Sequence, residues 1–482
     1  MSEPRRTAPS LPDAPVDAGT PVVLDAAARF LDRNLIAGGS PWRLLRLAGG
    51  SRAVVERWRG GGVVGPGEGR LARTLIAQGL VHPRPTGTLT IDDVDVVIPV
   101  HDDPAPLRSL LAQLSGLHVV VVDDGSRAHE LIEECCAEFA VALVRLEENV
   151  GPAGARNAGL AATSRPVVWF LDADVSVLDA HRVLERLGAH LEDPLVGAVA
   201  GRIRGGPGAS ARDVFERRFS PLDMGARSAL VVPRAPVGYV PAACLVARRA
   251  ALGAGFDPAL RVGEDVDLVW RLHDEGWLVR YVADVEVTHR ARGTWRNWWS
   301  QRTGYGASAS VLAARHGERV APWRVDPWTL VTWTSLAARR PAVAMRVMGV
   351  THDALVARLG PDTERAGAVA RTLMARAMGD SIGPSARALV RTYGPLVVLA
   401  AVHPRLRWRA LALFALGTGW RWRDERVRVR DVPLALADDL AYCVGVWRGA
   451  WRQRSARAIT PQFMTPSIRL AHVLGARTLD DL

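Results

Sequence analysis

Short apolar runs alternate with longer amphipathic stretches through the middle of the chain. Most of the runs are five to seven residues long, rich in valine, and bounded by polar residues or glycine. Near-continuous apolar runs are typical of strands buried on both faces, and helical stretches between them suit the crossovers of a parallel sheet. The pattern therefore predicts an α/β domain over residues 89–306 with a doubly covered, mostly parallel sheet. The expected strands are 94–100, 118–122, 141–146, 167–171, 196–200 and 278–287.

The first 88 residues carry shorter patterns. Residues 1–20 are rich in proline and alanine without an apolar core, which predicts a flexible tail and not a signal peptide. Helical spacing at 41–47 and 71–80, with a glycine-rich flexible turn at 60–69 between them, predicts a small helix-rich or winged-helix-like domain over 21–88. Two roles stay open for this domain: docking a peptide substrate or partner, or simply covering its neighbour.

Residues 307–482 are rich in alanine, leucine and arginine at helical spacing, which predicts an all-helical C-terminal region. Its longest apolar runs, 395–402 and 410–417, are far shorter than the roughly 20 residues that span a bilayer. Trp408, Trp420 and Trp422 stand among arginines, a composition that also suits a helix lying in a membrane surface. A peripheral membrane contact and a helical domain of short buried helices are both left open.

Polar clusters follow each of the first four expected strands. In open α/β sheets ligands bind beyond the carboxyl ends of the strands, so we expect these clusters to share one crevice. Asp172 and Asp174 end the fourth strand on one face, and their oxygens suit hard divalent cations such as Mn²⁺ or Mg²⁺. The other three clusters are Pro99 to Asp102, Asp123 to Ser126, and the glycine-rich 149–159 with Arg156 and Asn157.

Two further groups lie beyond these clusters. Glu264 and Asp265 open an expected helix, where a carboxylate either caps free N–H groups or takes a proton from an incoming hydroxyl. His289 ends the last strand-like run, and a histidine beside two aspartates is a reasonable third metal ligand. A structural role for each remains the simpler alternative.

Composition excludes several kinds of chemistry. The chain of 482 residues is 48% hydrophobic and 23% charged, enough for two or three domains. All 61 basic residues are arginine, which excludes a P-loop lysine and any lysine Schiff base. The net charge of +11 comes with no basic recognition element, so no nucleic acid is expected as a partner. Four cysteines without metal-ligand or disulfide spacing fit a reduced, cytoplasmic location.

Taken in order, the clusters resemble those of the inverting nucleotide-sugar glycosyltransferases of the GT-A fold, the family of cellulose, hyaluronan and galactofuranan synthases. The resemblance covers about 91–306 and departs from the family at Asp102, where asparagine is usual. It implies Asp265 as the general base that deprotonates the acceptor. The donor site that it implies comprises Pro99, Asp102, Asp124, Arg156, Asn157 and Asp172, with Asp172, Asp174 and His289 on Mn²⁺ or Mg²⁺.

The same resemblance places the acceptor near Glu264, Gln301, Arg302 and Trp298. The segment 301–305 is similar to the Gln-x-x-Arg-Trp element of polymer synthases, but glycine and tyrosine replace its last two residues, which favours a short oligosaccharide over a long polymer. The tryptophans at 295, 298 and 299, or Tyr305, would offer aromatic faces to a sugar. Alternatively, these tryptophans pack the junction with the C-terminal region.

A narrower resemblance adds a donor and an acceptor. The segments 42–47, 215–225 and 238–244 are similar to those of the glycosyltransferases of mycofactocin systems. That resemblance implies UDP-glucose as donor and a peptide-derived redox cofactor as acceptor, extended with β-linked glucose. A polysaccharide or glycolipid synthase at a membrane surface, a nucleotidyltransferase and a non-catalytic scaffold remain as alternatives.

Overall fold

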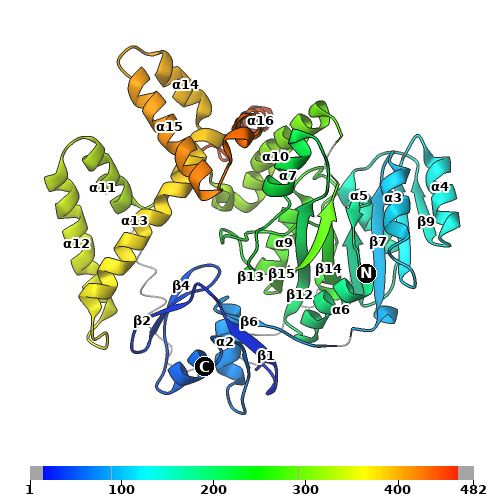
Figure 1. Ribbon diagram of the computed structural model, residues 1–482, viewed down its shortest axis with the longest axis horizontal. Coiled ribbons are helices and arrows are strands. Elements are labelled where there is room, and N and C mark those ends of the chain that lie inside the picture. The colour runs from blue at the N-terminus through cyan, green and yellow to red at the C-terminus, as the bar shows by residue number, and fades with distance from the viewer. Residues whose placement is uncertain (1–14, 88, 291–292, 465–482) are drawn as a thin grey trace.

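The structure is a computed structural model that describes residues 15–87, 89–290 and 293–464. A strand-rich N-terminal part (blue in Figure 1), an α/β part and a helical C-terminal part follow one another along the chain. Most of the expected tail, residues 1–14, lies outside the described residues.

A nine-stranded sheet forms the centre of the α/β part. Its order is β11-β15-β12-β14-β10-β7-β8-β9, with β13 paired to β15. The strands are β7 (Val94–Val100), β8 (His118–Asp124), β9 (Ala142–Leu146), β10 (Val167–Leu171), β11 (Val175–Ser176), β12 (Val196–Gly205), β13 (Ala229–Val231), β14 (Cys244–Arg248) and β15 (Leu278–His289). Strands β7 to β10, β12 and β15 share one direction, while β14 runs antiparallel between β10 and β12. The expected mostly parallel sheet is confirmed.

Helices cover both faces of this sheet, as the apolar strands predicted. Val96 and Val97, neighbours on β7, are fully buried in two different core clusters, one on each face. The covering helices are α3 (Pro104–Leu111), α4 (His129–Glu138), α5 (Pro152–Ala161), α6 (Ala180–Gly188), α7 (Ala211–Phe219), α8 (Arg249–Leu252) and α9 (Glu264–Asp274). Helix α5 lies so close to the sheet that a Cβ on Gly159 would come within 2.3 Å of Val97 Cγ1, so only glycine fits there.

The N-terminal part is strand-rich, so the expectation of a helix-rich domain is wrong. Its strands form two three-stranded sheets, β5-β1-β6 and β2-β3-β4. The elements are β1 (Pro21–Leu24), β2 (Arg29–Asp32), β3 (Leu35–Gly38), β4 (Arg43–Arg46), α1 (Ser51–Arg57), β5 (Gly62–Val63), α2 (Gly69–Ala77) and β6 (Val81–Pro83). The supposed helix at 41–47 is strand β4. Pairing with the apolar β3 decides its conformation, because seven residues are too few for local helical spacing to prevail.

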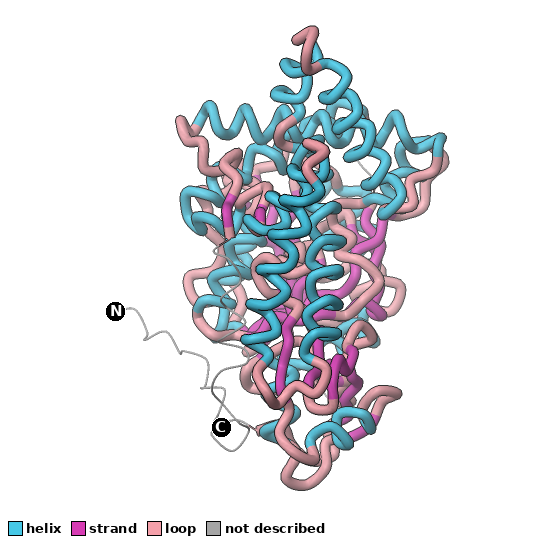
Figure 2. Tube along the Cα trace, turned by 90° about the vertical axis from the view of Figure 1, so that its left-hand side faces the viewer, coloured by secondary structure: helices cyan, strands magenta, loops and turns pink. Residues whose placement is uncertain are grey.

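The C-terminal part is helical apart from a two-residue parallel ladder. It consists of α10 (Trp295–His316), β16 (Arg324–Val325), α11 (Pro327–Ala337), α12 (Pro341–Leu359), α13 (Ala366–Arg391), α14 (Gly394–Val402), α15 (Arg407–Asp424), α16 (Val432–Arg452) and β17 (Gln462–Phe463). The domain boundary expected at residue 306 falls inside α10. Figure 2 shows the α14–α15 pair standing out above the rest of the molecule.

The N-terminal part contacts both of its neighbours. Arg73 on α2 pairs with Asp193 at 2.7 Å, in the loop before β12, and Arg46 on β4 donates to the carbonyl of Leu359 at the end of α12. Buried side chains of β3 and β4 join those of α12 and α13 in one apolar cluster. The N-terminal part therefore packs against both the α/β part and the helical part and connects them.

No single helix among the described residues is both long and apolar enough to cross a membrane. Helices α13 and α14 would satisfy the length and composition together, but they are bent by 73° at their junction.

Candidate active site

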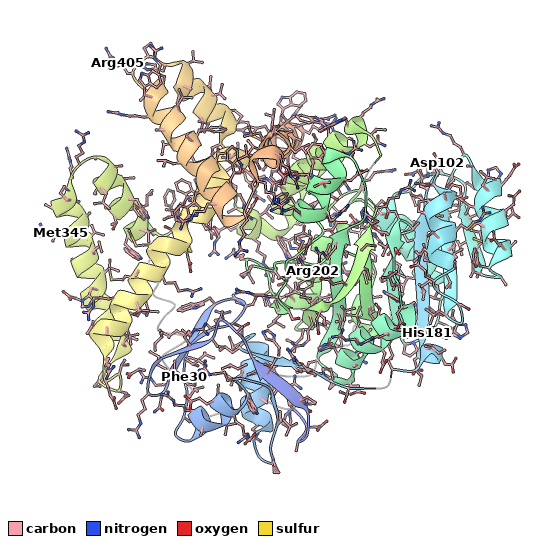
Figure 3. The ribbon with its side chains drawn as sticks, in the orientation of Figure 1. Phe30, Asp102, His181, Arg202, Met345 and Arg405 are labelled. Carbon is pink, nitrogen blue, oxygen red and sulfur yellow. The ribbon has the colours of Figure 1, made fainter. Side chains whose placement is uncertain are left out.

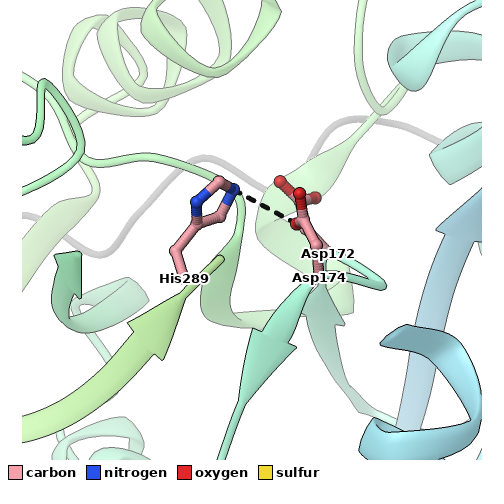
Figure 4. Close-up of side chains that lie close together, drawn as sticks. All are labelled: Asp172, Asp174 and His289. Carbon is pink, nitrogen blue, oxygen red and sulfur yellow. Dashed lines mark ion pairs between the residues drawn. The ribbon is translucent and has the colours of Figure 1, made fainter. Parts of the chain in front are cut away.

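Asp172, Asp174 and His289 meet at the carboxyl ends of their strands (Figure 4). One ligand atom from each lies within 4.8 Å of the others, and His289 Nε2 is 3.1 Å from Asp174 Oδ1. The short strand β11 brings them together, because its pairing with β15 sets Val175 opposite His289. This oxygen and imidazole set fits Mn²⁺ or Mg²⁺ in donor type and in spacing.

A single buried guanidinium joins this cluster to the start of α9. Arg156 donates from Nη2 to Asp172 Oδ1 at 2.6 Å and from Nη1 to Glu264 Oε1 at 2.8 Å. Burial opposes the charged form, but the two carboxylates outweigh it and raise the pKa of Arg156, which therefore stays charged. Helix α5, β10 and α9 are fixed to one another through this side chain.

The three acidic residues in the first turn of α9 have different environments. Glu264 is held by Arg156. Asp267 is buried and accepts from Arg271 Nε and His316 Nε2, both at 2.9 Å. Burial acts to raise the pKa of Asp267, but those two hydrogen bonds outweigh it and lower the pKa to about 2, so Asp267 is a fixed structural anion.

Asp265 is the carboxylate of this turn without such a cation. Among the described residues, the backbone N–H of Val266 donates to Asp265 Oδ1 at 2.8 Å. Burial, followed by the negative charge of Glu264, raises the pKa of Asp265 to about 7, although Arg156 opposes the rise. A carboxylate that binds a proton near neutral pH has the basicity needed to take one from a hydroxyl.

The loops after β8 and β9 are tied to each other and to the segment before α9. Both oxygens of Asp124 accept backbone N–H groups, from Val150 at 2.7 Å and from Gly151 at 3.0 Å. Arg261 donates to the side chain and the carbonyl of Asn149. Asp124 thus shapes the loop before Arg156, and the base contact expected of it stays a prediction.

Pro99, Asp102 and Asn157 are the remaining residues expected to contact the donor. Pro99 lies in β7, and Asp102 follows that strand with a φ of 56°, in the left-handed region that asparagine and aspartate tolerate better than most other non-glycine residues. This explains how Asp102 can replace the usual asparagine, and its carboxylate accepts from the N–H of Arg127 at 2.7 Å. Asn157 uses both ends of its amide on the backbone of Phe256, which favours a structural role over a donor contact.

Two of the expected acceptor contacts are instead part of the core. Trp298 and Arg302 on α10 are buried almost completely, so neither offers a face to a sugar. Trp298 Nε1 donates to Glu216 at 2.6 Å, while Arg302 donates to Glu216 and, at 2.7 Å, to Asp438 on α16. The alternative of a packed junction with the C-terminal region is the arrangement found.

Gln301 keeps a place near the metal cluster. With Arg302, His289 and Glu216 it lines a cavity of about 10 Å³, room for roughly one water molecule. Its side-chain oxygen accepts from Arg302 Nη1 at 2.9 Å. An acceptor contact by Gln301 stays a prediction. A wider hollow of about 630 Å³ lies at the opposite, amino ends of β7 to β9, far from the polar clusters.

Tyr239 lies near Asp265 and near two other tyrosines, and the sequence singled out only one of the three, Tyr305. Burial raises the pKa of Tyr239, and the nearby Asp265, Tyr305 and Tyr442 raise it further. Each tyrosine is partly buried and comes from a different element: the loop before β14, α10 and α16. Tyr239 and Tyr442 carry no local signal, since only tertiary packing brings them to this place.

Backbone packing fixes this group. Trp270 on α9 donates to the carbonyl of Gly238, which sets the loop carrying Tyr239. A Cβ on Gly304 would lie 3.7 Å from Val262, so α10 rests on the segment that leads into α9. A Cβ on Gly306 would come within 2.1 Å of the carbonyl of Tyr442, so the backbones of α10 and α16 touch.

Comparisons with known proteins show which family the chain is similar to. A family model described as glycosyl transferase family 2 covers residues 95–255. Over 479 residues, 95% of this chain and 100% of the relative, the chain is 36% identical to the pre-mycofactocin glycosyltransferase of Mycobacterium tuberculosis. It is also 34% identical over 134 residues to an N-acetylglucosaminyltransferase of Rhizobium meliloti, covering 26% of this chain and 31% of that protein.

Among solved structures, the chain is similar to a mannosyltransferase from Pyrobaculum calidifontis in complex with GDP-Man and Mn²⁺. That match has a TM-score of 0.42 and 17% identity and covers 75% of this chain and 87% of the other. The full-length relative removes the nucleotidyltransferase and scaffold alternatives. With its sheet of GT-A type and its ordered carboxylate clusters, the chain belongs to the family 2 glycosyltransferases and is an enzyme that transfers a sugar.

Proposed function

We propose that this enzyme is an inverting, metal-dependent glucosyltransferase that moves glucose from UDP-glucose to a hydroxyl of a peptide-derived redox cofactor of the mycofactocin type, as a short β-linked oligosaccharide. The near full-length similarity to a pre-mycofactocin glycosyltransferase supports this choice of acceptor. The short 301–305 segment without an Arg-Trp pair supports a short product.

The observation that carries the mechanism is the Arg156 bridge. One guanidinium contacts Asp172, on the side expected to hold the donor diphosphate, and Glu264, which directly precedes Asp265. A displacement needs its base and its leaving group at opposite ends of one line, and a shared rigid link holds that spacing. Asp172, Asp174 and His289 would hold Mn²⁺ or Mg²⁺, whose positive charge would neutralise the charge that develops on the departing diphosphate.

The chain's own residues account for the proton. Asp265 accepts the proton of the acceptor hydroxyl as that oxygen bonds to the anomeric carbon, while the bond between that carbon and the UDP oxygen breaks. A single displacement inverts the configuration, so an α-linked donor gives a β-linked product. With its pKa near 7, Asp265 is poised to be ionised before the step and protonated after it.

Tyr239 and its two tyrosine neighbours form the proposed acceptor wall, in place of Trp298 and Arg302. Aromatic faces suit both a sugar ring and the apolar part of a peptide-derived acceptor. Arg391 makes a cation–π contact with Tyr442, and its guanidinium carbon lies 4.2 Å from the centre of the tyrosine ring. The helical C-terminal region would therefore complete the acceptor site.

Calorimetric titration with UDP-glucose and with GDP-mannose, each with and without Mn²⁺ or Mg²⁺, tests the donor half. We expect UDP-glucose to bind only with the metal, and we expect Asp174→Ala to abolish that binding. Asp353→Ala, at an exposed position on α12, is the matched control and should bind as the parent does.

If only GDP-mannose bound, and only with the metal, the proposed donor site would stand but the proposed donor would change from UDP-glucose to GDP-mannose. Equal binding of UDP-glucose by the parent and by Asp174→Ala would contradict the metal site itself. Mass spectrometry of the products made on the peptide-derived acceptor then counts the sugars added, and a long ladder of masses would favour the polymer-synthase alternative.

A further inference from the structure

The α14–α15 hairpin projects from the molecule, with α15 packed against α13 and α14 left uncovered. It stands above the remaining helices in two perpendicular views, and Arg405 marks its outer turn (Figures 2 and 3). Of the described residues of α14, none is buried. A free-standing helix in water should be polar on its outer face, and this one is not.

The side chains of α14 are apolar on every side. After Gly394 and Pro395 the helix contains only leucine, valine and alanine. Val398, Leu399 and Val402 are 63%, 67% and 77% exposed. Soluble monomers rarely leave a continuous apolar surface of this kind uncovered, which points to a hydrophobic environment in the working protein.

The hairpin tip, residues 403–409, combines cations with an aromatic ring. Arg405, Arg407 and Arg409 are all exposed, and among the described residues no salt bridge is found for any of them. Trp408 lies between the last two arginines and is 75% exposed. Arginine and tryptophan beside exposed aliphatic residues are the composition that settles at the boundary between lipid headgroups and acyl chains.

The hairpin is too short to cross a bilayer. Nine residues of α14 reach about 14 Å, against a hydrocarbon core of about 30 Å. The sharp bend between α13 and α14 prevents the two helices from forming one straight span. A shallow insertion at the interface is the geometry that remains.

A second hairpin, α11–α12, repeats the composition at the same end of the molecule. Its turn carries the exposed Arg339 and Arg340, and Met345 on α12 is largely exposed (Figure 3). Both turns point upward in Figure 1. Both hairpins carry arginines at their turns. If these surfaces paired with those of a second copy of the chain, like charges would face each other, which disfavours such pairing.

We propose that the α14–α15 hairpin anchors this enzyme to an anionic lipid surface, with the apolar side chains of α14 in the acyl boundary and the arginines of the hairpin tip on lipid phosphates. Phosphate oxygens accept from guanidinium groups in a bidentate manner, and each arginine adds attraction to a negative surface. This anchor is independent of the sugar donor and of the acceptor.

Sedimentation of the full chain with lipid vesicles tests the anchor. We expect binding to vesicles containing phosphatidylglycerol, weaker binding to pure phosphatidylcholine, and partial release by salt. The triple change Arg405→Gln, Arg407→Gln and Arg409→Gln should weaken binding about fivefold per arginine. Leu399→Asp should weaken it about tenfold or more, because a charge would replace an exposed apolar side chain that inserts into the acyl boundary.

Matched variants elsewhere separate this surface from general basicity. Arg33→Gln, Arg59→Gln and Arg70→Gln remove three exposed arginines of the N-terminal part, and Leu131→Asp alters an exposed leucine on α4. Both controls should bind vesicles as the parent does.

Equal losses in the hairpin and control variants, or no binding to either vesicle, would overturn the proposal. So would a parent chain that is dimeric by light scattering and becomes monomeric on Leu399→Asp while vesicle binding is unchanged, since the apolar surface would then serve self-association.

Discussion

The donor half and the acceptor half of this active site are built in different ways. The donor half consists of segments that follow consecutive strands of the sheet, with Asp102, Asp124 and Asp172 at or just after strand ends and Arg156 in α5. The acceptor half is assembled from a loop, α10 and α16, and its tyrosines at 239, 305 and 442 are far apart in sequence. Local motifs therefore describe the donor half well, whereas only tertiary packing defines the acceptor half. Asp265 stands where the two halves meet.

Removing the base would separate the two halves most sharply. Asp265→Asn keeps the size of the side chain but removes its basicity, so we expect the transfer rate to fall by about 10²- to 10⁴-fold. The affinity for UDP-glucose, measured by calorimetry, should stay the same, because Asp265 contacts no expected donor group. A variant that loses donor binding as well would show that the halves are not separable.

Core residues of α10 should affect stability and not sugar recognition. Trp298→Ala should lower the free energy of unfolding by about 3–5 kcal/mol, since it leaves a large cavity and removes a hydrogen bond to Glu216. Urea denaturation followed by circular dichroism measures this loss. The partly exposed Trp299 provides the control, because Trp299→Ala removes the same ring from the surface of the same helix. If Trp298→Ala instead left stability intact and raised the KM for the acceptor, the earlier acceptor assignment would be restored.

The pH profile tests the charge balance at Asp265. Its ionised form is the base, so kcat/KM should fall about tenfold per pH unit below its pKa of about 7. Glu264→Gln removes a negative charge that raises this pKa, so the acidic limb should move to lower pH. Glu185→Gln, on the remote helix α6, should leave the limb in place. If the acidic limb of the kcat/KM profile stays in place in Glu264→Gln, a group other than Asp265 controls the pH dependence.

The smallest expected effect is on acceptor binding, from changes at Tyr442. Tyr442→Ala should raise the KM for the acceptor about 2- to 12-fold, the range that one aromatic contact supplies, with the donor affinity unchanged. Tyr442→Phe keeps the ring and should restore most of the acceptor affinity. Equal acceptor KM values in the parent and both variants would remove α16 from the acceptor wall.

How far the sequence predicts this molecule follows the same division. Val94 to Val100 and the other apolar runs predicted the sheet, because full burial on both faces leaves an unmistakable pattern. That Asp172, Asp174 and His289 lie together was also predicted, although the β11–β15 pairing that joins Asp174 to His289 was not. Residues 41–47, which contain strand β4, were expected to be helical, since the pairing of β4 with β3 is not encoded in that segment alone.

Polar residue types also mislead when their partners are distant. Arg302 beside Trp298 has the composition of a sugar-binding surface. Its charge is instead satisfied by Glu216, from α7, and by Asp438, more than a hundred residues later. Nothing near Arg302 in the sequence announces these two carboxylates, so the distinction between an acceptor contact and a core ion pair required the fold.

The contact between α10 and α16 limits how relatives of this enzyme can diverge. A Cβ on Gly445 would come within 2.1 Å of the carbonyl of Thr303, as one on Gly306 would at Tyr442, so neither helix can acquire a side chain at the crossing. The catalytic part and the helical part must therefore be inherited together. A hybrid joined at residue 306 would divide α10 and break this crossing, so a chimera with a new acceptor range should exchange α10 and α16 as one unit.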